Sequence, residues 1–373
     1  MKLRIMTKRI KILYTIPNFD TAGSGKVVCD LVKHIDKSKF EPHICCMHTK
    51  GSYFETVKNL GVPIHVFPFA VAYKPLYRLP FRIWTIRQFF KRQQFDIVHS
   101  WHWKSDFTEP LAAKLAGIPF VYTKKAMGWG NRGWRWRSQL SSKIVTINSD
   151  MESHFFSEMP FKIAPIPIGL DVNDFGILEK TMYIEDSYRI NQDDFVIVSI
   201  ANLVAVKGIE ILLEAVKQIN HLKIKVFIVG DDSSDYAKKL KIDYASSQVI
   251  FTGKQQNIKS YLSLADIFVI PTKDEGRKEG QPIAPIEAML SGRMVLGSRI
   301  SGIKDILEPF QECIFEPNSV SDLKTKLEWV MQMNTNDRRL LAEKMYTFAS
   351  QNYTIENSMA KHEELYFNML KLG

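Results

Sequence analysis

The sequence contains few cysteines and lacks a long apolar run. Its 373 residues include four cysteines, whose spacing matches neither a disulfide framework nor a zinc site. A metal site at Cys45-Cys46, between His43 and His48, is conceivable, but we expect buried free thiols, as in a reducing cytoplasm. No apolar run is as long as a membrane span, and no short-period repeat is evident. These absences exclude a disulfide-stapled fold, a helical membrane span and a short-repeat array.

Acidic residues are missing from two long stretches. Neither 70–95 nor 110–149 contains Asp or Glu, and both interleave basic with aromatic side chains. Because such side chains suit the interface of an anionic leaflet, we expect 73–94 and 124–143 to contact a membrane surface. We predict an amphipathic helix in the first stretch and a mobile Trp/Arg loop in the second. The alternative for the first is a helix that packs its aromatic side into the core.

The formal net charge of +10 implies anionic partners. These include a nucleotide, lipid head groups or a nucleic acid, and the α/β pattern described next argues against the last. We therefore predict no nucleic-acid partner.

Length and patterning predict two α/β domains. A globular composition, 45% hydrophobic and 24% charged, is spread over more residues than one ordinary core needs. The basic and then apolar start faintly resembles a signal peptide, but 10–16 contains Lys11 and ends at Pro17, so we predict a first strand. A second series of strands and helices starts at 195–200.

The stretch 278–292 carries two carboxylates with seven residues between them, Glu279 in a turn and Glu287 on a predicted helix. It follows the apolar run 267–270, which is typical of a buried parallel strand. Pro282 and Pro285 suit a first helical turn, whose unbonded N–H groups favour a diphosphate. Glu287 can then accept hydrogen bonds from a ribose diol. The alternative is an ordinary strand–helix unit with two solvated glutamates.

These residues resemble a known signature. Glu279 and Glu287, with Gly280, Pro282 and the Ala-Met-x-x-Gly tail, resemble the Glu-x7-Glu motif of retaining glycosyltransferases of family 4, which have the GT-B fold. The resemblance implies an α/β protein with two Rossmann-like, doubly wound parallel-sheet domains facing a central cleft. A nucleotide-diphosphate sugar would bind mainly to the second domain.

The same resemblance implies the domain boundaries. Residues 163–171 resemble the segment that ends the first domain of the family, with Ile168 in place of its Asn. The expected organisation is an N-terminal acceptor-side domain, a polar linker, a C-terminal nucleotide-sugar-binding domain and a final helix that crosses back onto the first domain. In sequence order these are residues 1–171, 172–194, 195–354 and 355–373.

The resemblance also assigns roles in the second domain. Glu279 would lie by the donor sugar and Glu287 would hold the ribose, while Lys207 would neutralise the diphosphate. In 201–208, Lys207-Gly208 match the family pattern, but Asn202 stands where Arg is usual. Either Lys207 neutralises the diphosphate alone, or Arg277, Lys278 or Lys125 helps. The remaining donor-site candidates are Gly280, Gln281, Pro282, Ile283, Gly253, Lys254 and, in the first domain, Gly23.

Two further candidates belong to the first domain. Many family members place a His after the strand predicted at 120–123, where this chain has Lys124 and Lys125. We therefore count Lys125 as a candidate for binding phosphate or acceptor. His102 follows another predicted strand and is a candidate for substrate contact; the alternative is a structural histidine.

The predicted function is a retaining, metal-independent hexosyltransferase without a cofactor. It would move sugar from a nucleotide-diphosphate sugar, with UDP the family's commonest nucleotide, to a saccharide or lipid-linked acceptor in cell-surface polysaccharide synthesis (lipopolysaccharide or capsule). The expected location is cytoplasmic, on the inner face of the cytoplasmic membrane. The alternatives are a catalytically weak scaffold protein of the same fold and a nucleotide-sugar epimerase.

Overall fold

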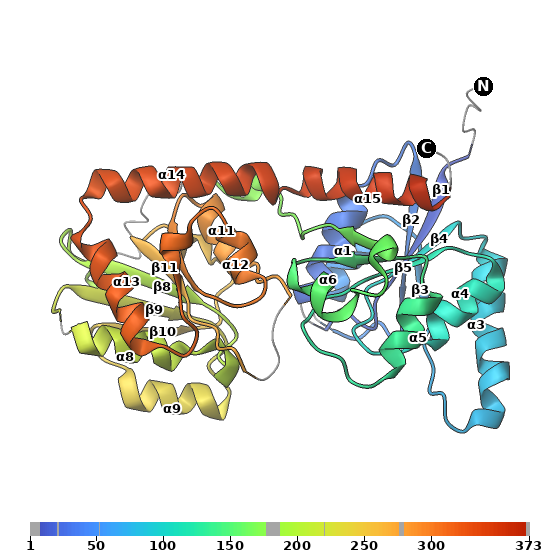
Figure 1. Cartoon of the computed structure of the whole chain (residues 1–373), viewed down its shortest axis with the longest axis horizontal. Coiled ribbons are helices and arrows are strands. Elements are labelled where there is room, and N and C mark those ends of the chain that lie inside the picture. The colour runs from blue at the N-terminus through green and yellow to red at the C-terminus, as the bar shows by residue number, and fades with distance from the viewer. Residues whose placement is uncertain are drawn as a thin grey trace. The chain divides into compact units, whose positions relative to one another are not determined.

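The computed structural model describes residues 8–20, 22–51, 53–176, 187–219, 221–275 and 280–370. The chain divides into two compact units, each built on its own sheet (Figure 1). We call Met1–Gly169 together with Ile355–Gly373 unit 1, and Leu170–Thr354 unit 2. No helix among the described residues combines the length and the apolar character that crossing a membrane requires.

Unit 1 is built on a seven-stranded parallel sheet in the order β3-β2-β1-β4-β5-β6-β7. Its strands are β1 (Ile10–Thr15), β2 (Phe40–Cys46), β3 (Ile64–Val66), β4 (Ile97–Ser100), β5 (Phe120–Thr123), β6 (Lys143–Thr146) and β7 (Ile163–Pro165). Its α-helices are α1 (Ala22–His34), α2 (Phe54–Lys58), α3 (Leu79–Gln93), α4 (Thr108–Ala116), α5 (Gly133–Leu140), α6 (Asp150–Phe155) and α15 (Ile355–Met369). Short 3-10 turns lie at η1 (Leu76–Arg78) and η2 (Pro160–Lys162).

Unit 2 has a six-stranded parallel sheet in the order β10-β9-β8-β11-β12-β13. Its strands are β8 (Phe195–Ile200), β9 (Ile224–Val229), β10 (Val249–Gly253), β11 (Ile267–Ile270), β12 (Met294–Ser298) and β13 (Ile314–Phe315). Its α-helices are α8 (Ile209–Ile219), α9 (Asp235–Tyr244), α10 (Lys259–Leu262), α11 (Ala284–Leu290), α12 (Ile303–Ile306), α13 (Val320–Gln332) and α14 (Thr335–Asn352). The 3-10 turns are η3 (Val172–Asp174), η4 (Ala205–Lys207) and η5 (Gln311–Cys313).

In both sheets the winding reverses at a central pair of strands. In unit 1 the strand order runs outward from β1 and β4, and in unit 2 from β8 and β11. At such a reversal the loops from neighbouring strands leave toward opposite faces, so a crevice opens at the carboxyl ends of the pair. The fold therefore provides one ligand-binding position in each unit.

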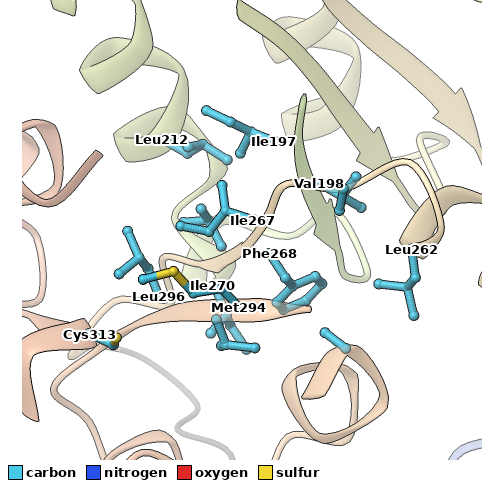
Figure 2. Packing of buried hydrophobic residues seen from close by; sticks show 14 of the residues in the cluster. Ile197, Val198, Leu212, Leu262, Ile267, Phe268, Ile270, Met294, Leu296 and Cys313 are labelled. Atoms are coloured by element: carbon cyan, nitrogen blue, oxygen red, sulfur yellow. The ribbon is translucent and has the colours of Figure 1, made fainter. Parts of the chain in front are cut away.

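The unit 2 core explains why its strands are continuous apolar runs. Ile197 on β8 pairs with Ile267 on β11, and both lie on the face of the sheet that Leu212 of α8 covers, whereas Phe268 on β11 lies on the other face with Val198 (Figure 2). A sheet covered by helices on both faces requires apolar residues at successive positions, not at alternate ones. The strand predicted over 267–270 is confirmed.

Several local expectations change in the structure. The strand expected over 143–149 ends at Thr146. In the polar stretch 172–194, Tyr188 and Ile190 pack against the core of unit 2, and 177–186 lies outside the described residues. The four cysteines are buried and unpaired, as expected.

The stretch predicted as a basic amphipathic helix forms η1 and α3. Ile83, Ile86 and Phe90 are buried on one side of α3, whereas Phe81 and Trp84 are exposed on the other. The predicted helix is confirmed, and its apolar residues are divided between the core and the surface; membrane contact stays a prediction.

The Trp/Arg loop expected over 124–143 is wrong for its second half, which forms α5. Arg137 on this helix is fully buried, so it is not part of a surface patch. Its Nη1 lies 3.4 Å from Glu109 Oε2, and its Nη2 donates to Ser100 Oγ at 2.8 Å. Burial raises the pKa of Glu109 to about 7, against the opposing effect of the Arg137 charge.

We expect that replacing only one member of the Arg137–Glu109 pair destabilises the protein more than replacing both. Glu109→Leu should lower the free energy of unfolding by about 3–5 kcal/mol, because it leaves a buried guanidinium without its partner. The double variant Glu109→Leu/Arg137→Met should recover most of this loss. Six of the seven tryptophans lie in unit 1, so urea titration followed by tryptophan fluorescence reports on it. A double variant no more stable than Glu109→Leu would contradict the account.

Four described histidines are buried in unit 1; His43 is paired with Glu41, and the other three are His99, His102 and His362. His99 is hydrogen-bonded to the hydroxyl groups of Tyr366 and Thr123. His362 donates from Nδ1 to the Ser358 carbonyl. Burial lowers the pKa of His362 to about 4 and that of His102 to about 2, and it holds the pKa of His99 well below the ordinary value of 6.5. All three are therefore neutral in the folded protein at pH values where the unfolded chain takes up protons.

Unit 1 should lose stability in mild acid. Each neutral histidine costs about 1.4 kcal/mol of unfolding free energy per pH unit below 6.5, because only the unfolded state gains its proton. Glu109, with its raised pKa, acts in the opposite direction, so these three histidines against one glutamate give a net loss of about 3 kcal/mol per pH unit, to which the lowered pKa values of His43 and His65 add. Urea titrations at pH 7.5 and 5.5 measure it.

A matched pair of variants separates this effect from general acid sensitivity. His362→Gln should reduce the pH dependence, whereas His221→Gln, at an exposed position of unit 2, should leave it unchanged. Equal stability of the parent protein at both pH values would contradict the expectation.

Candidate functional site

The loops that follow β8 and β11 contact each other at the carboxyl edge of the unit 2 sheet. The Lys273 N–H donates to the Val206 carbonyl at 2.8 Å. Gly208 has a φ of +64°, and a Cβ there would lie 2.1 Å from the Pro271 carbonyl oxygen. A side chain at this position would push the loops apart, so glycine is required after Lys207.

The residues that start at Gly280 pack against the N-terminus of α12. A Cβ on Gly302 would lie 2.2 Å from the Gly280 carbonyl oxygen, and the φ of Gly302 is +82°. The Gly302 N–H donates to Asp305 Oδ2 at 3.0 Å, which fixes this turn. Glycine at position 302 is therefore required by packing as well as by backbone conformation.

Two more loops reach the same edge of the sheet. A Cβ on Gly230, which follows β9, would lie 1.8 Å from the Ala201 carbonyl oxygen. The Gly230 N–H donates to the carbonyl of Gly253, at the end of β10, at 3.1 Å. The structure thus brings the candidates that follow β8, β10 and β11 to one edge, which we call the unit 2 edge.

The side chains at the unit 2 edge differ in exposure. Asn202 and Lys254 are exposed, Lys207 and Glu287 are half-buried, and Gln281 is buried. Glu287 lies in the first turn of α11, where its N–H donates to the Ile283 carbonyl at 3.0 Å. Of the two prolines expected in the first turn, Pro285 lies there, whereas Pro282 precedes the helix.

Lys273 is a residue that was not predicted from the sequence. Its Nζ pairs with Glu210, and with Glu275 at 3.1 Å. Since Glu210 lies in the first turn of α8, this lysine joins the loop after β11 to the helix that follows Lys207. Its position three residues after a predicted strand could have marked Lys273 as a site candidate, but its partners Glu210 and Glu275 follow only from the fold.

The predicted catalytic Glu279 lies outside the described residues, as do Arg277 and Lys278. Within the part of the chain that the structure describes, no group of three or more His, Cys, Asp or Glu side chains is arranged to hold a metal ion.

In unit 1, Lys125, which follows β5, bonds to the loop after β4 and to the first turn of α1. Its Nζ donates to the Trp101 carbonyl at 2.6 Å and to Ser24 Oγ at 3.1 Å. Gly23 lies beside Ser24, at a kink in the first turn of α1 with φ 0° and ψ −114°. The structure therefore brings Lys125 and Gly23 to one edge, although they are about a hundred residues apart in sequence.

His102 follows β4 and is buried against Phe69, with ring centroids 5.7 Å apart. Burial lowers its pKa to about 2, with further lowering by the charges of Arg137, Lys125 and Lys104. Its Nδ1 is buried and has no hydrogen-bond partner within the described residues. His102 is therefore a neutral hydrogen-bonding group, not a proton carrier near neutral pH.

A pocket of about 740 Å³ opens next to His102. Most of its lining residues come from three segments, within 70–73, 102–107 and 130–136, and Met47 also lines it. This volume lies in the range of small-molecule sites. The outer two segments belong to the two stretches without acidic residues, but their meeting at one pocket is a property of the fold.

Comparison with known proteins identifies the family. The model for "Glycosyltransferase Family 4" matches residues 21–174, and the model for "Glycosyl transferases group 1" matches residues 183–348. In unit 2 the second match includes the loops after β8, β10 and β11 and the turn before α12.

Relatives and solved structures agree with these matches. A UDP-Gal:alpha-D-GlcNAc-diphosphoundecaprenol alpha-1,3-galactosyltransferase of Escherichia coli is 22% identical over 77% of this chain and 79% of its own. A glycosyltransferase structure from Rickettsia africae has a TM-score of 0.85 at 17% identity, covering 98% of this chain and 100% of that one. The UDP complex of Anabaena Alr3699/HepE has a TM-score of 0.79 at 17% identity, covering 95% and 99%. The chain belongs to the glycosyltransferases of the family 4 and group 1 type, and its two parallel-sheet units have the GT-B fold.

Proposed function

We propose that this glycosyltransferase moves a hexose-type sugar from a nucleotide-diphosphate sugar, a UDP-sugar, to a saccharide or lipid-linked acceptor in cell-surface polysaccharide synthesis, with retention of configuration. The observation that carries the proposal is the contact of the loops after β8 and β11 at the unit 2 edge. The UDP complex of the Anabaena protein and the UDP-galactose donor in the name of the Escherichia coli relative support the choice of nucleotide.

In the proposed donor site, Glu287 accepts hydrogen bonds from the ribose hydroxyls. The backbone of 280–283 and the Lys207 ammonium stabilise the charge that develops on the departing diphosphate. Preorganised stabilisation of this kind often contributes more to catalysis than any other single effect. Because Asn202 carries no charge and Lys273 is already paired with Glu210 and Glu275, Lys207 supplies more of the positive charge than usual.

The proposed reaction breaks the bond between the sugar C1 and the diphosphate oxygen and forms one between C1 and an acceptor hydroxyl oxygen. The diphosphate takes the negative charge and accepts the hydroxyl proton on the same face of the sugar. Glu279 would lie by the donor sugar. No metal or cofactor takes part.

The proposal includes contact with the inner face of the cytoplasmic membrane. Leu76, Tyr77, Phe81 and Trp84 on η1 and α3 are 52–75% exposed, and basic residues surround them. Large apolar side chains that stay in water carry a free-energy cost that an interfacial environment removes. Arg82 and Arg87 already donate to the carbonyls of Ala72, Lys74 and Leu115, so Lys91 and Arg92 are the basic residues of α3 better placed to meet anionic head groups.

The donor-site proposal predicts two separable defects. Lys207→Ala should reduce turnover about 100-fold with little change in UDP affinity, since loss of a preorganised charge-stabilising donor costs about 3 kcal/mol in the transition state. Glu287→Ala should weaken UDP binding about tenfold or more, because hydrogen bonds to a charged group are each worth about 1.5–3 kcal/mol. A thermal-shift screen of UDP, GDP and ADP sugars selects the donor, and donor hydrolysis or transfer measures turnover.

The matched control is Lys217→Ala, at an exposed position of α8, which should behave as the parent protein. Turnover by Lys207→Ala near the parental rate would contradict the role of this lysine. Absence of a thermal shift with every nucleotide sugar would overturn the donor-site proposal as a whole.

The membrane proposal predicts loss of binding when the exposed apolar side chains are removed. Phe81→Ser/Trp84→Ser should sediment with anionic liposomes at least tenfold less than the parent, because each side chain contributes about 1.5–3 kcal/mol when buried. Leu222→Ser/Ile242→Ser removes side chains that are 87% and 83% exposed in unit 2 and should have no effect. If the parent protein sedimented with the liposomes no better than the Phe81→Ser/Trp84→Ser variant, the proposed membrane contact would be contradicted.

A further inference from the structure

The pocket beside His102 has walls that are fixed before any ligand binds. The first wall, residues 70–73, is tied to the start of α4 by the Val71 N–H, which donates to Thr108 Oγ1 at 3.1 Å. Arg82 of α3 holds the same wall, donating from Nη1 to the carbonyls of Ala72 at 2.6 Å and Lys74 at 2.9 Å. This wall is therefore held from two helices.

The other two walls are fastened to each other. Ser105 Oγ accepts from the N–H groups of Gly130 at 3.1 Å and Asn131 at 3.4 Å. A Cβ on Gly133 would lie 2.5 Å from the Ser105 carbonyl oxygen, so the walls touch there. Arg137 donates from below to the Asp106 carbonyl at 2.9 Å. Preorganised walls of this kind lower the ordering cost of binding.

The pocket lining suits a sugar ring. Tyr73, Trp103 and Trp136 are 44%, 59% and 64% exposed and line the pocket, so they offer aromatic faces to a ligand. The C–H faces of sugar rings stack against such faces. The neutral His102 also lines the pocket, and its buried Nδ1 lacks a partner among the described residues.

The charge at the pocket is positive. Lys104 and Arg132 are exposed lining residues, and no carboxylate of a described residue lies within ion-pair distance of either. The carboxylate among the lining residues is Asp106, whose Oδ1 accepts from the N–H and hydroxyl of Thr108 and from the Glu109 N–H. Burial is the main cause of the lowered pKa of His102, and the positive charges of Arg137, Lys125 and Lys104 lower it further.

We propose that this pocket binds the acceptor as a saccharide that carries negative charge beside its sugar ring, with Trp103 and Trp136 contacting the ring and Lys104 and Arg132 the anionic group. The inference rests on the proposed function and adds the chemical class of the acceptor. A phosphate or diphosphate at the reducing end and the carboxylate of an acidic sugar supply the same chemistry. Arg132 can bind either group through two parallel hydrogen bonds.

The test measures binding of four soluble probes by calorimetry, with saturating UDP present so that a sugar phosphate cannot enter the donor site. The charged probes are N-acetylglucosamine 1-phosphate and trigalacturonic acid, and the neutral ones are N-acetylglucosamine and maltotriose. At least one charged probe should bind tenfold or more tightly than its neutral counterpart, and added salt should weaken it. Preference for the phosphate indicates a lipid-diphosphate source, and preference for the uronate an acidic sugar.

Variants assign the binding to the pocket. Lys104→Gln/Arg132→Gln should abolish the preference for the charged probe and keep the weak neutral binding, whereas Trp136→Ala should weaken both. Lys217→Gln/Lys238→Gln removes the same charge from exposed positions of unit 2 and should behave as the parent. Equal affinity for charged and neutral probes, or a charge preference that survives Lys104→Gln/Arg132→Gln, would overturn the proposal, as would absence of binding by every probe.

Failure of this inference differs from failure of the proposed function. The protein could show a thermal shift with UDP-sugars and hydrolyse them, yet bind charged and neutral probes equally. That result would support the donor-site proposal and contradict only the proposed class of acceptor. The tryptophans of the pocket provide a second readout, because Trp103 and Trp136 fluorescence should change with the charged probe and not with UDP.

Discussion

The reversal of winding between β8 and β11 is the constraint on which the unit 2 edge depends. These two strands are hydrogen-bonded neighbours, with Ile267 opposite Ile197, yet their following loops belong to connections on opposite faces. The loops consequently end beside each other, and glycine at positions 208 and 302 lets backbone pack directly against backbone. Charge and backbone N–H groups thus converge without any side chain having to reach far.

Unit 1 has the same strand order, but the loops that follow its central strands are supported in a different way. The loops after β4 and β5 are long and aromatic, and a buried ion pair supports them from beneath. Arg137 contacts Glu109, Ser100 and the Asp106 carbonyl, so one guanidinium connects the core of the unit to the wall of its pocket. A buried charge is an expensive way to gain stability, and its contribution here is better understood as fixing the geometry of that wall.

Much of the fold could be predicted from the sequence because buried parallel strands are continuous apolar runs. The runs at 195–200 and 267–270 are strands in the structure, and the candidates Lys207 and Gly280 lie in the loops that follow them. Arg137 could not be recognised as a core residue, since its partner Glu109 lies 28 positions earlier and nothing local indicates the contact. The pocket was equally hidden, because segments that are distant in sequence form it. Tertiary contact, not local pattern, determined both.

The hydrogen bonds that hold the pocket walls have a consequence for how acceptor specificity can change in evolution. The bonds that shape the walls come from Ser105, Arg82 and Arg137, whereas the side chains that face the ligand are others, such as Trp103, Arg132 and Trp136. The residues that fix the shape of the pocket are therefore different from those that would recognise the ligand. Exchanges at the recognition positions alter which acceptor fits while the scaffold keeps its shape, so new specificities are reachable through single substitutions that leave folding intact.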